Sequence, residues 1–164
     1  MFNQYLEQYG NRLYALCLKL YGGRREEANE LYQETWFKAY RAFSSYRQTG
    51  EFIAWVTKIC VNTYRDMLRR QKRGKAFVFT AGDDPQAMID RIPAPVEDEA
   101  CRAVREAVEA LHEPLRLCVI LYYFYGSSVQ ETAQTLRIPP GTVKSRLSKA
   151  RELLRKELSQ YDVG

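Results

Sequence analysis

Basic and hydroxyl side chains crowd the stretch from Pro139 to Leu158, which opens with Pro-Pro-Gly. Helical spacing divides this stretch into an apolar side and a side that donates hydrogen bonds. The apolar side is Val143, Leu147, Ala150 and Leu154; the outer side is Lys144, Ser145, Ser148, Lys149 and Arg151, with Thr142 and Arg146 at its margins. Such cations and hydroxyls bind phosphates and base edges. A merely solvated charged helix is the alternative.

A second polar stripe lies between residues 51 and 73. It recurs at steps of four and three residues and consists of Lys58, Asn62, Arg65, Arg69 and Lys72. Cations on one helix face can bind backbone phosphate, and the amide of Asn62 is suited to a base. An exposed helical asparagine also occurs without any function, so both interpretations stay open.

Catalysis and metal binding have little support in this sequence. The four cysteines, Cys17, Cys60, Cys101 and Cys118, form no CxxC pair, and His112 is the single histidine. No Gly-rich phosphate loop, GxSxG elbow or HExxH helix occurs. We therefore expect buried reduced thiols, no metal, no cofactor and no enzymatic activity.

Composition indicates a globular protein, and its charge distribution suggests a polyanionic partner, with merely solvated charged faces as the alternative. The charged fraction is 27% and the hydrophobic fraction 46% of 164 residues, which is ordinary for a soluble protein. Net charge is +6 over residues 1–73, −4 over 74–99 and +3 over 100–164. Two basic blocks around an acidic spacer favour phosphate binding. No run is apolar enough to span a bilayer and no signal peptide is evident, so we expect no membrane insertion and a cytoplasmic location.

Three helices are predicted in the first block, at residues 2–21, 25–43 and 51–73. Gly22 and Gly23 end the first, and a polar loop at Ser44–Gly50 follows the second. The predicted buried stripe of the third is Phe52, Trp55, Val56, Ile59, Thr63 and Met67. Core packing is favoured for Trp55 over base stacking, whereas Tyr64, beside the basic stripe, stays open.

The second block reads as a helix-turn-helix domain behind a linker. Residues 74–99 hold three of the six prolines and predict a flexible acidic linker. Helical periodicity resumes at Val104 and stops at Gly126. Ser128 and Glu131 then fit a capping box that opens a short helix, and Pro140 suits the first position of the last helix. The fold class predicted is all-α, with two small helical domains.

Three segments of the sequence resemble a known protein family. EANELYQETWFKAYRAFSSYR, EFIAWVTKICVNTYRDMLRRQKR and SSVQETAQTLRIPPGTVKSRLSKARELLRKEL, in this order, resemble bacterial RNA polymerase sigma factors of the extracytoplasmic-function class. The resemblance implies an N-terminal domain at residues 1–73 that binds core polymerase and recognises and melts the −10 element. It implies a linker at 74–99 and a domain at 100–164 that reads the −35 element through its helix-turn-helix.

The resemblance also assigns residues and partners. Contacts with core polymerase fall on Glu30, Gln33 and Glu34, which on residues alone are only the polar flank of a helix. Contacts with −10 DNA fall on Ser45, Tyr46 and Arg47 of the loop together with Lys58, Asn62, Arg65, Arg69 and Lys72; contacts with −35 DNA fall on Thr142, Lys144, Ser145, Arg146, Ser148, Lys149 and Arg151. Core RNA polymerase, promoter DNA and an anti-sigma factor are the implied partners, and the free chain is expected to be a monomer.

The sequence leaves two alternatives open. The alternative function is a stand-alone helix-turn-helix regulator that binds duplex DNA as a dimer, because such regulators usually pair on half-sites one helical turn apart. The aromatic run Tyr122–Tyr125 is either additional core or an exposed surface for a partner.

Overall fold

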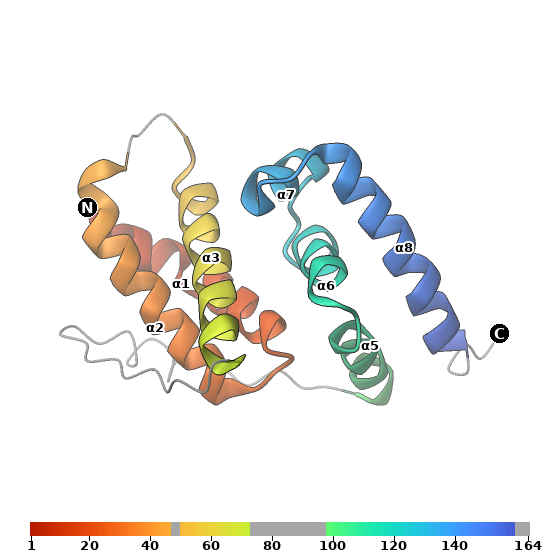
Figure 1. Cartoon of the computed structure of the whole chain (residues 1–164). Coiled ribbons are helices and arrows are strands. Elements are labelled where there is room, and N and C mark those ends of the chain that lie inside the picture. The colour runs from red at the N-terminus through yellow and green to blue at the C-terminus, as the bar shows by residue number, and fades with distance from the viewer. Residues whose placement is uncertain (47–49, 73–97, 160–164) are drawn as a thin grey trace. The chain divides into compact units, whose positions relative to one another are not determined.

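The computed structural model describes residues 1–46, 50–72 and 98–159, which divide into two compact units, one in residues 1–72 and one in 98–159. Within these ranges the chain is helical and contains no strand. Figure 1 shows the helices of each unit, labelled in chain order. The all-α fold class with two helical domains is thereby confirmed. Residues 74–97 of the predicted linker lie outside the described residues.

The first unit is a bundle of three helices, α1 (Phe2–Leu20), α2 (Arg25–Ala42) and α3 (Phe52–Lys72), in mutual contact. Gly22 and Gly23 adopt φ values of 61° and 85°, so the turn after α1 uses a conformation that glycine takes without strain. Four tyrosines are almost fully buried among these helices: Tyr14, Tyr21, Tyr32 and Tyr64. Burial raises the pKa of Tyr32 to about 12, because the phenolate would lose its hydration in the core.

The buried face of α3 differs from the predicted stripe. Its buried residues are Phe52, Ile53, Val56, Thr57, Cys60, Val61, Thr63, Tyr64 and Met67. Tyr64 is only 2% exposed and meets Tyr21 edge to face at 5.1 Å, so it belongs to the core. Trp55 and Ile59 are only half-buried. The real face is rotated toward Cys60 because α3 packs against both other helices, which periodicity alone does not reveal.

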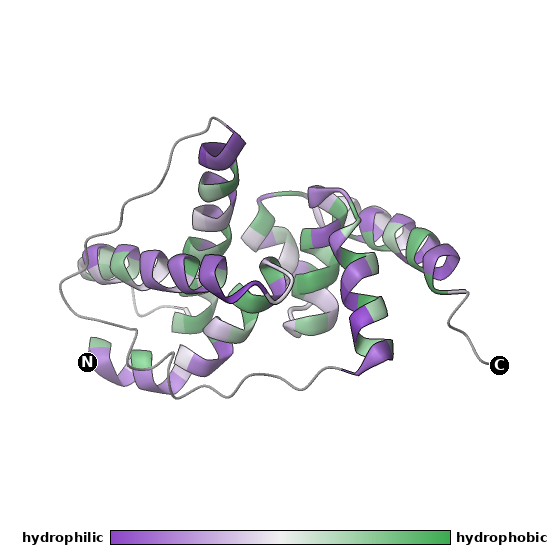
Figure 2. Cartoon of the chain, turned by 90° about the horizontal axis from the view of Figure 1, so that it is seen from below, coloured by the Kyte–Doolittle hydropathy of each residue, from purple (hydrophilic) through white to green (hydrophobic). Residues whose placement is uncertain are grey.

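The second unit is built around α8 (Pro140–Leu158), which contacts α5 (Glu99–Glu109), α6 (Glu113–Val119) and α7 (Val129–Leu136). Hydrophobic and hydrophilic bands alternate along these helices in Figure 2. α6 continues into one π-helical turn, η2 (Ile120–Phe124), where the Tyr125 N–H donates to the Ile120 carbonyl at 2.9 Å. The sequence did not predict this turn. Gly126 ends the segment with φ at 85°, as expected.

The helix-turn-helix consists of α7 and α8. The Glu131 N–H donates to Ser128 Oγ at 3.0 Å, and the Ser128 N–H donates to Glu131 Oε1 at 2.9 Å, so the predicted capping box is confirmed. Arg137 ends α7 in the left-handed region, and Pro140 begins α8 as predicted. The two helices are therefore joined by a tight turn of three residues, Arg137 to Pro139.

Three of the four cysteines are buried, and Cys101 is not. Cys101 is exposed in the first turn of α5, so the expectation of burial is wrong for it. Cys17 and Cys60 face each other across α1 and α3, with the two Sγ atoms 3.8 Å apart. Burial, with the neighbouring Cys60, raises the pKa of the Cys17 thiol and disfavours its thiolate.

Candidate nucleic-acid interface

The outer face of α8 presents the side chains expected from the spacing. Val143, Leu147 and Ala150 are buried and anchor the helix in the unit. The exposed residues of the proposed face are Lys144, Ser145, Ser148, Lys149 and Arg151, while Thr142 and Arg146 are half-buried at its edges. The structure brings these seven together on one helix. A helix of this kind, at the second position of a helix-turn-helix, has the geometry to enter a major groove.

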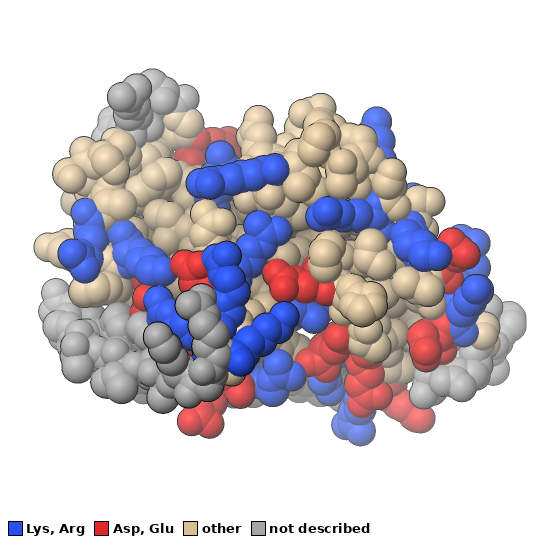
Figure 3. Space-filling model, viewed as in Figure 1, with Lys and Arg blue, Asp and Glu red and all other residues tan. Residues whose placement is uncertain are grey.

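Two cations of this face already have partners within the unit. Arg151 Nη1 donates to the Tyr123 hydroxyl at 3.0 Å, which links α8 to η2. Lys149 Nζ lies 3.9 Å from Glu152 Oε2, and both side chains are more than half exposed. In Figure 3, Lys and Arg side chains follow α8, with Asp and Glu among them toward its C-terminal end. The positive potential of the helix is therefore greatest toward its N-terminal half.

The polar stripe of α3 is exposed to different degrees. Lys58, Arg69 and Lys72 are exposed, whereas Asn62 and Arg65 are half-buried. Figure 3 shows Lys and Arg side chains gathered over the C-terminal part of α3. The sequence interpretation overlooked Asp66, which lies within this stripe and accepts a hydrogen bond from Arg69 Nη2. The face is cationic with one carboxylate that orients an arginine.

The end of α2 is less of a loop than predicted. Phe43–Ser45 continues α2 as a short 3₁₀ turn, η1, in which Ser45 Oγ donates to the Ala42 carbonyl. Tyr46 packs against Trp55, with ring centroids 5.0 Å apart, and donates its hydroxyl hydrogen to the Gly50 carbonyl at 2.7 Å. Arg47 lies outside the described residues. Tyr46 and Trp55 are both half-buried, so each keeps part of its surface open.

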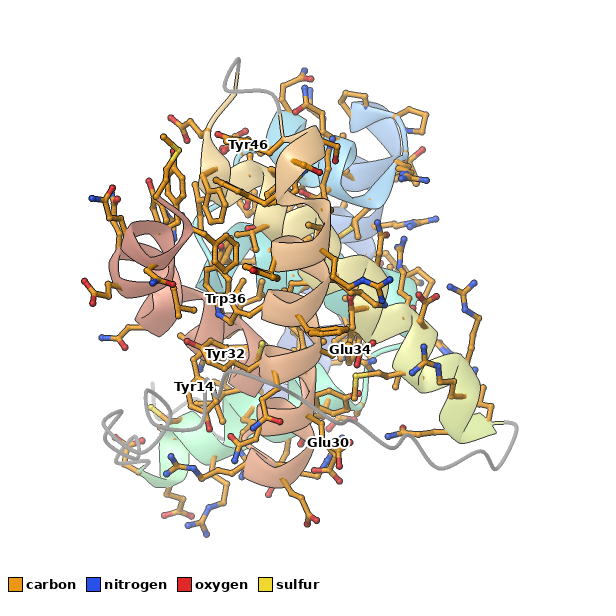
Figure 4. The ribbon with its side chains drawn as sticks, turned by 90° about the vertical axis from the view of Figure 1, so that its left-hand side faces the viewer. Tyr14, Glu30, Tyr32, Glu34, Trp36 and Tyr46 are labelled. Atoms are coloured by element: carbon orange, nitrogen blue, oxygen red, sulfur yellow. The ribbon has the colours of Figure 1, made fainter. Side chains whose placement is uncertain are left out.

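The polar flank of α2 separates into an exposed and a buried part. Glu30 is exposed and Gln33 is half-buried, but Glu34 is only 5% exposed. Figure 4 shows Glu30 and Glu34 on one side of α2 and Tyr32 and Trp36 on the other, nearer α1. Partial desolvation, together with Glu26 and Glu27, raises the pKa of Glu30.

Glu34 is held by a charge network that joins α2 to α3. Lys38 Nζ lies 3.6 Å from Glu34 Oε1 and 3.8 Å from Asp66 Oδ2. Asp66 in turn pairs with Arg69, a member of the α3 stripe. A carboxylate this buried needs a cation beside it, and Lys38 supplies that cation. Glu34 therefore has a structural role in this unit, whatever else it contacts.

Several aromatic side chains are exposed, and two of them, Phe37 and Tyr40, were not predicted from the sequence. On α2, Phe37 and Tyr40 are 37% and 66% exposed. In η2, Tyr122, Tyr123 and Phe124 are 36%, 49% and 42% exposed, so the core alternative for this run is wrong for these three. The sequence could have indicated the exposure of Phe37 and Tyr40, because both lie outside the helical stripe of buried residues that contains Trp36 and Ala39.

Both units match known families. Residues 5–74 match the family model described as Sigma-70 region 2, and residues 101–154 match the one described as Sigma-70, region 4. The first match contains all of α2 and α3, and the second ends within α8. Each model therefore covers one of the two faces described above.

Curated proteins with sequences similar to this chain carry corresponding names. The ECF RNA polymerase sigma factor SigE of Mycolicibacterium smegmatis is 30% identical over 98% of this chain and 62% of its own length. The RNA polymerase sigma-H factor of Pseudomonas aeruginosa is 32% identical over 81% of this chain and 74% of its own length. The ECF RNA polymerase sigma-E factor of Escherichia coli is 31% identical over 76% and 70%. The chain thus spans less than two thirds of the mycobacterial relative.

Two solved structures share the fold. The sigma factor RpoE of Bartonella quintana, crystallised with the anti-sigma factor NepR, aligns with a TM-score of 0.76 and 24% identity over 96% of both chains. CnrH, in complex with the cytosolic domain of CnrY, aligns with a TM-score of 0.70 and 21% identity over 97% of this chain and 88% of its own. At these identities the likeness describes the fold alone. Across the described ranges, no helix is both long and apolar enough to cross a bilayer.

Proposed function

The chain belongs to the extracytoplasmic-function family of RNA polymerase sigma factors, and from this premise we propose that it directs core RNA polymerase to promoters. In this proposal the second unit binds the −35 element, and the first unit binds core polymerase and opens the −10 element. The chain acts in the cytoplasm and leaves nucleotide addition to the polymerase. The observation that carries the proposal is the presence of one cationic helix face in each unit, on α3 and on α8.

The α8 face is proposed to read the −35 element in the major groove. Its exposed lysines and serines donate to phosphates and base edges, while the buried side holds the helix rigidly. We expect Lys149→Ala to weaken dependence on the upstream element. Unchanged dependence would mean that this side chain is only solvated.

The α3 face is proposed to hold the opened −10 strand. Lys58, Arg65, Arg69 and Lys72 provide cations for the backbone, and Asn62 is half-buried between them. A groove that binds an extruded base offsets the few kcal/mol of stacking and pairing lost on melting, so no ATP is needed. Ser45 and Tyr46 lie before the start of α3 and are proposed to contribute to the same site.

The test of this assignment compares duplex and pre-melted promoters. Asn62→Ala should impair transcription from a duplex promoter fragment more than from one with an artificial bubble at the −10 element. The reason is that only the duplex requires the free energy of base capture. The matched control is Lys58→Gln, at an exposed position on the same helix. It should lower transcription from both templates alike, because it removes one phosphate contact. Equal loss for Asn62→Ala on both templates would remove its role in base capture.

The outer side of α2 is proposed to bind core polymerase. Glu30 and Gln33 supply polar contacts, and the exposed Phe37 and Tyr40 supply apolar area beside them. Aromatic side chains with neighbouring polar groups are enriched at protein interfaces. Glu34 is proposed to support this surface through Lys38 rather than to be wholly available to the partner.

An anti-sigma factor is the proposed regulator. The RpoE structure contains the anti-sigma factor NepR, and the CnrH structure contains the cytosolic domain of CnrY. Free chain should be a monomer. Two measurements separate this function from that of a stand-alone regulator: the mass of the free chain in light scattering and its retention on immobilised core polymerase. A stand-alone regulator would be a dimer and would not be retained.

A further inference from the structure

Arg137 occupies a backbone conformation that suits glycine. Its φ and ψ are 58° and 47°, and it is the one non-glycine residue with positive φ among the described residues. The turn enforces this conformation, because the Ile138 N–H donates to the Ala133 carbonyl at 3.0 Å, the six-to-one hydrogen bond of a Schellman motif. A glycine would take this conformation at lower free energy, so arginine lowers stability here.

The guanidinium of Arg137 has no internal role in the unit. The residue is exposed, and no described residue makes a hydrogen bond or ion pair with its side chain. Arg151 and Lys149 on α8 differ, because Tyr123 and Glu152 already engage them. Hydrogen bonds of the turn hold the backbone of Arg137 in the left-handed conformation, but no contact inside the described chain uses its side chain, which points to a ligand outside it.

The position of Arg137 selects the chemistry of that ligand. It lies in the turn three residues before α8, the helix proposed to enter the major groove. Residues beside a recognition helix face the sugar-phosphate backbone that borders the groove, and arginine binds phosphate with two parallel hydrogen bonds. We propose that Arg137 is a DNA contact that binds a backbone phosphate next to the upstream element and fixes the register of α8. This inference rests on the proposed function of α8.

The decisive variant is Arg137→Gly in the full chain bound to core polymerase. It should raise the melting temperature of the free chain by about 4 °C, because glycine relieves the strain. It should also weaken binding to a genomic promoter fragment that the wild-type holoenzyme transcribes, by about fivefold, and lower the salt slope of binding by about 1. Because a phosphate is contacted, the loss should be similar on a fragment with a scrambled upstream element.

Two further variants make the test specific. Arg137→Lys keeps the charge and the strained backbone, so it should keep the salt slope and show no gain in melting temperature. Arg102→Ala removes an exposed arginine from α5 in the same unit and should leave DNA binding unchanged. If Arg137→Gly binds DNA with wild-type affinity and salt slope, the inference is wrong while the proposed function stands. If the wild-type holoenzyme does not bind promoter fragments at all, both the inference and the proposed function are wrong.

Discussion

Replacing Lys38 by methionine tests the charge network between α2 and α3. The change keeps the unbranched apolar stem of the side chain and leaves Glu34, only 5% exposed, without the ammonium that lies 3.6 Å away. Breaking a buried ion pair from one side costs about 3–5 kcal/mol, and because Lys38 is 35% exposed, solvent screening reduces this to about 2 kcal/mol. For a unit of this size the melting temperature should then fall by about 10 °C.

Tryptophan fluorescence is the suitable readout, because both tryptophans, Trp36 and Trp55, lie in the first unit. The matched control is Lys58→Met on the exposed side of α3, which should change stability by less than about 0.5 kcal/mol. Adding Glu34→Gln to Lys38→Met removes the stranded charge and should restore more than half of the lost stability. The reasoning is refuted if the two substitutions destabilise additively, or if Lys38→Met behaves like the control.

Three other substitutions address separate parts of the molecule. Ser128→Ala removes the capping box of α7 and should cost about 1 kcal/mol, seen by far-UV circular dichroism, whereas the exposed Ser145→Ala should cost nothing measurable. Glu30→Gln should raise the melting temperature at neutral pH, because the raised pKa of Glu30 means that its ionised form is disfavoured in the folded state. This gain in melting temperature should vanish as the pH falls through that pKa. A gain that persists in acid would contradict this cause. Tyr40→Ser should weaken retention by core polymerase while the melting temperature falls only slightly, because Tyr40 is 66% exposed, and a large thermal shift would instead place this ring in the core.

Helix-turn-helix geometry was predictable because its signals are local. The capping box at Ser128, the start of α8 at Pro140 and the division of α8 into buried and exposed sides all follow from short-range spacing. The placement of the seven proposed −35 residues agrees with the structure for the same reason. Their contacts with DNA remain predictions.

Long-range packing limited the prediction elsewhere. The sequence alone does not decide between a core and a surface role for Tyr64, and the structure packs it on Tyr21 from α1. Glu34 looked like one more residue of a polar flank, yet it is buried and pairs with Lys38, which also pairs with Asp66 of α3. The proximity of Cys17 and Cys60 likewise depends on how α1 meets α3. Sequence periodicity describes one helix at a time, so contacts made between helices stay invisible to it.

The central claim is that this chain gives core RNA polymerase the ability to start transcription at specific promoters. The most direct measurement is run-off transcription from a library of genomic promoter fragments by core polymerase with and without the purified chain. We predict discrete transcripts that require the chain and that are lost when the upstream or −10 element of the fragment is scrambled. Binding of the chain to duplex DNA without core polymerase, combined with no promoter-specific transcript, would contradict the account.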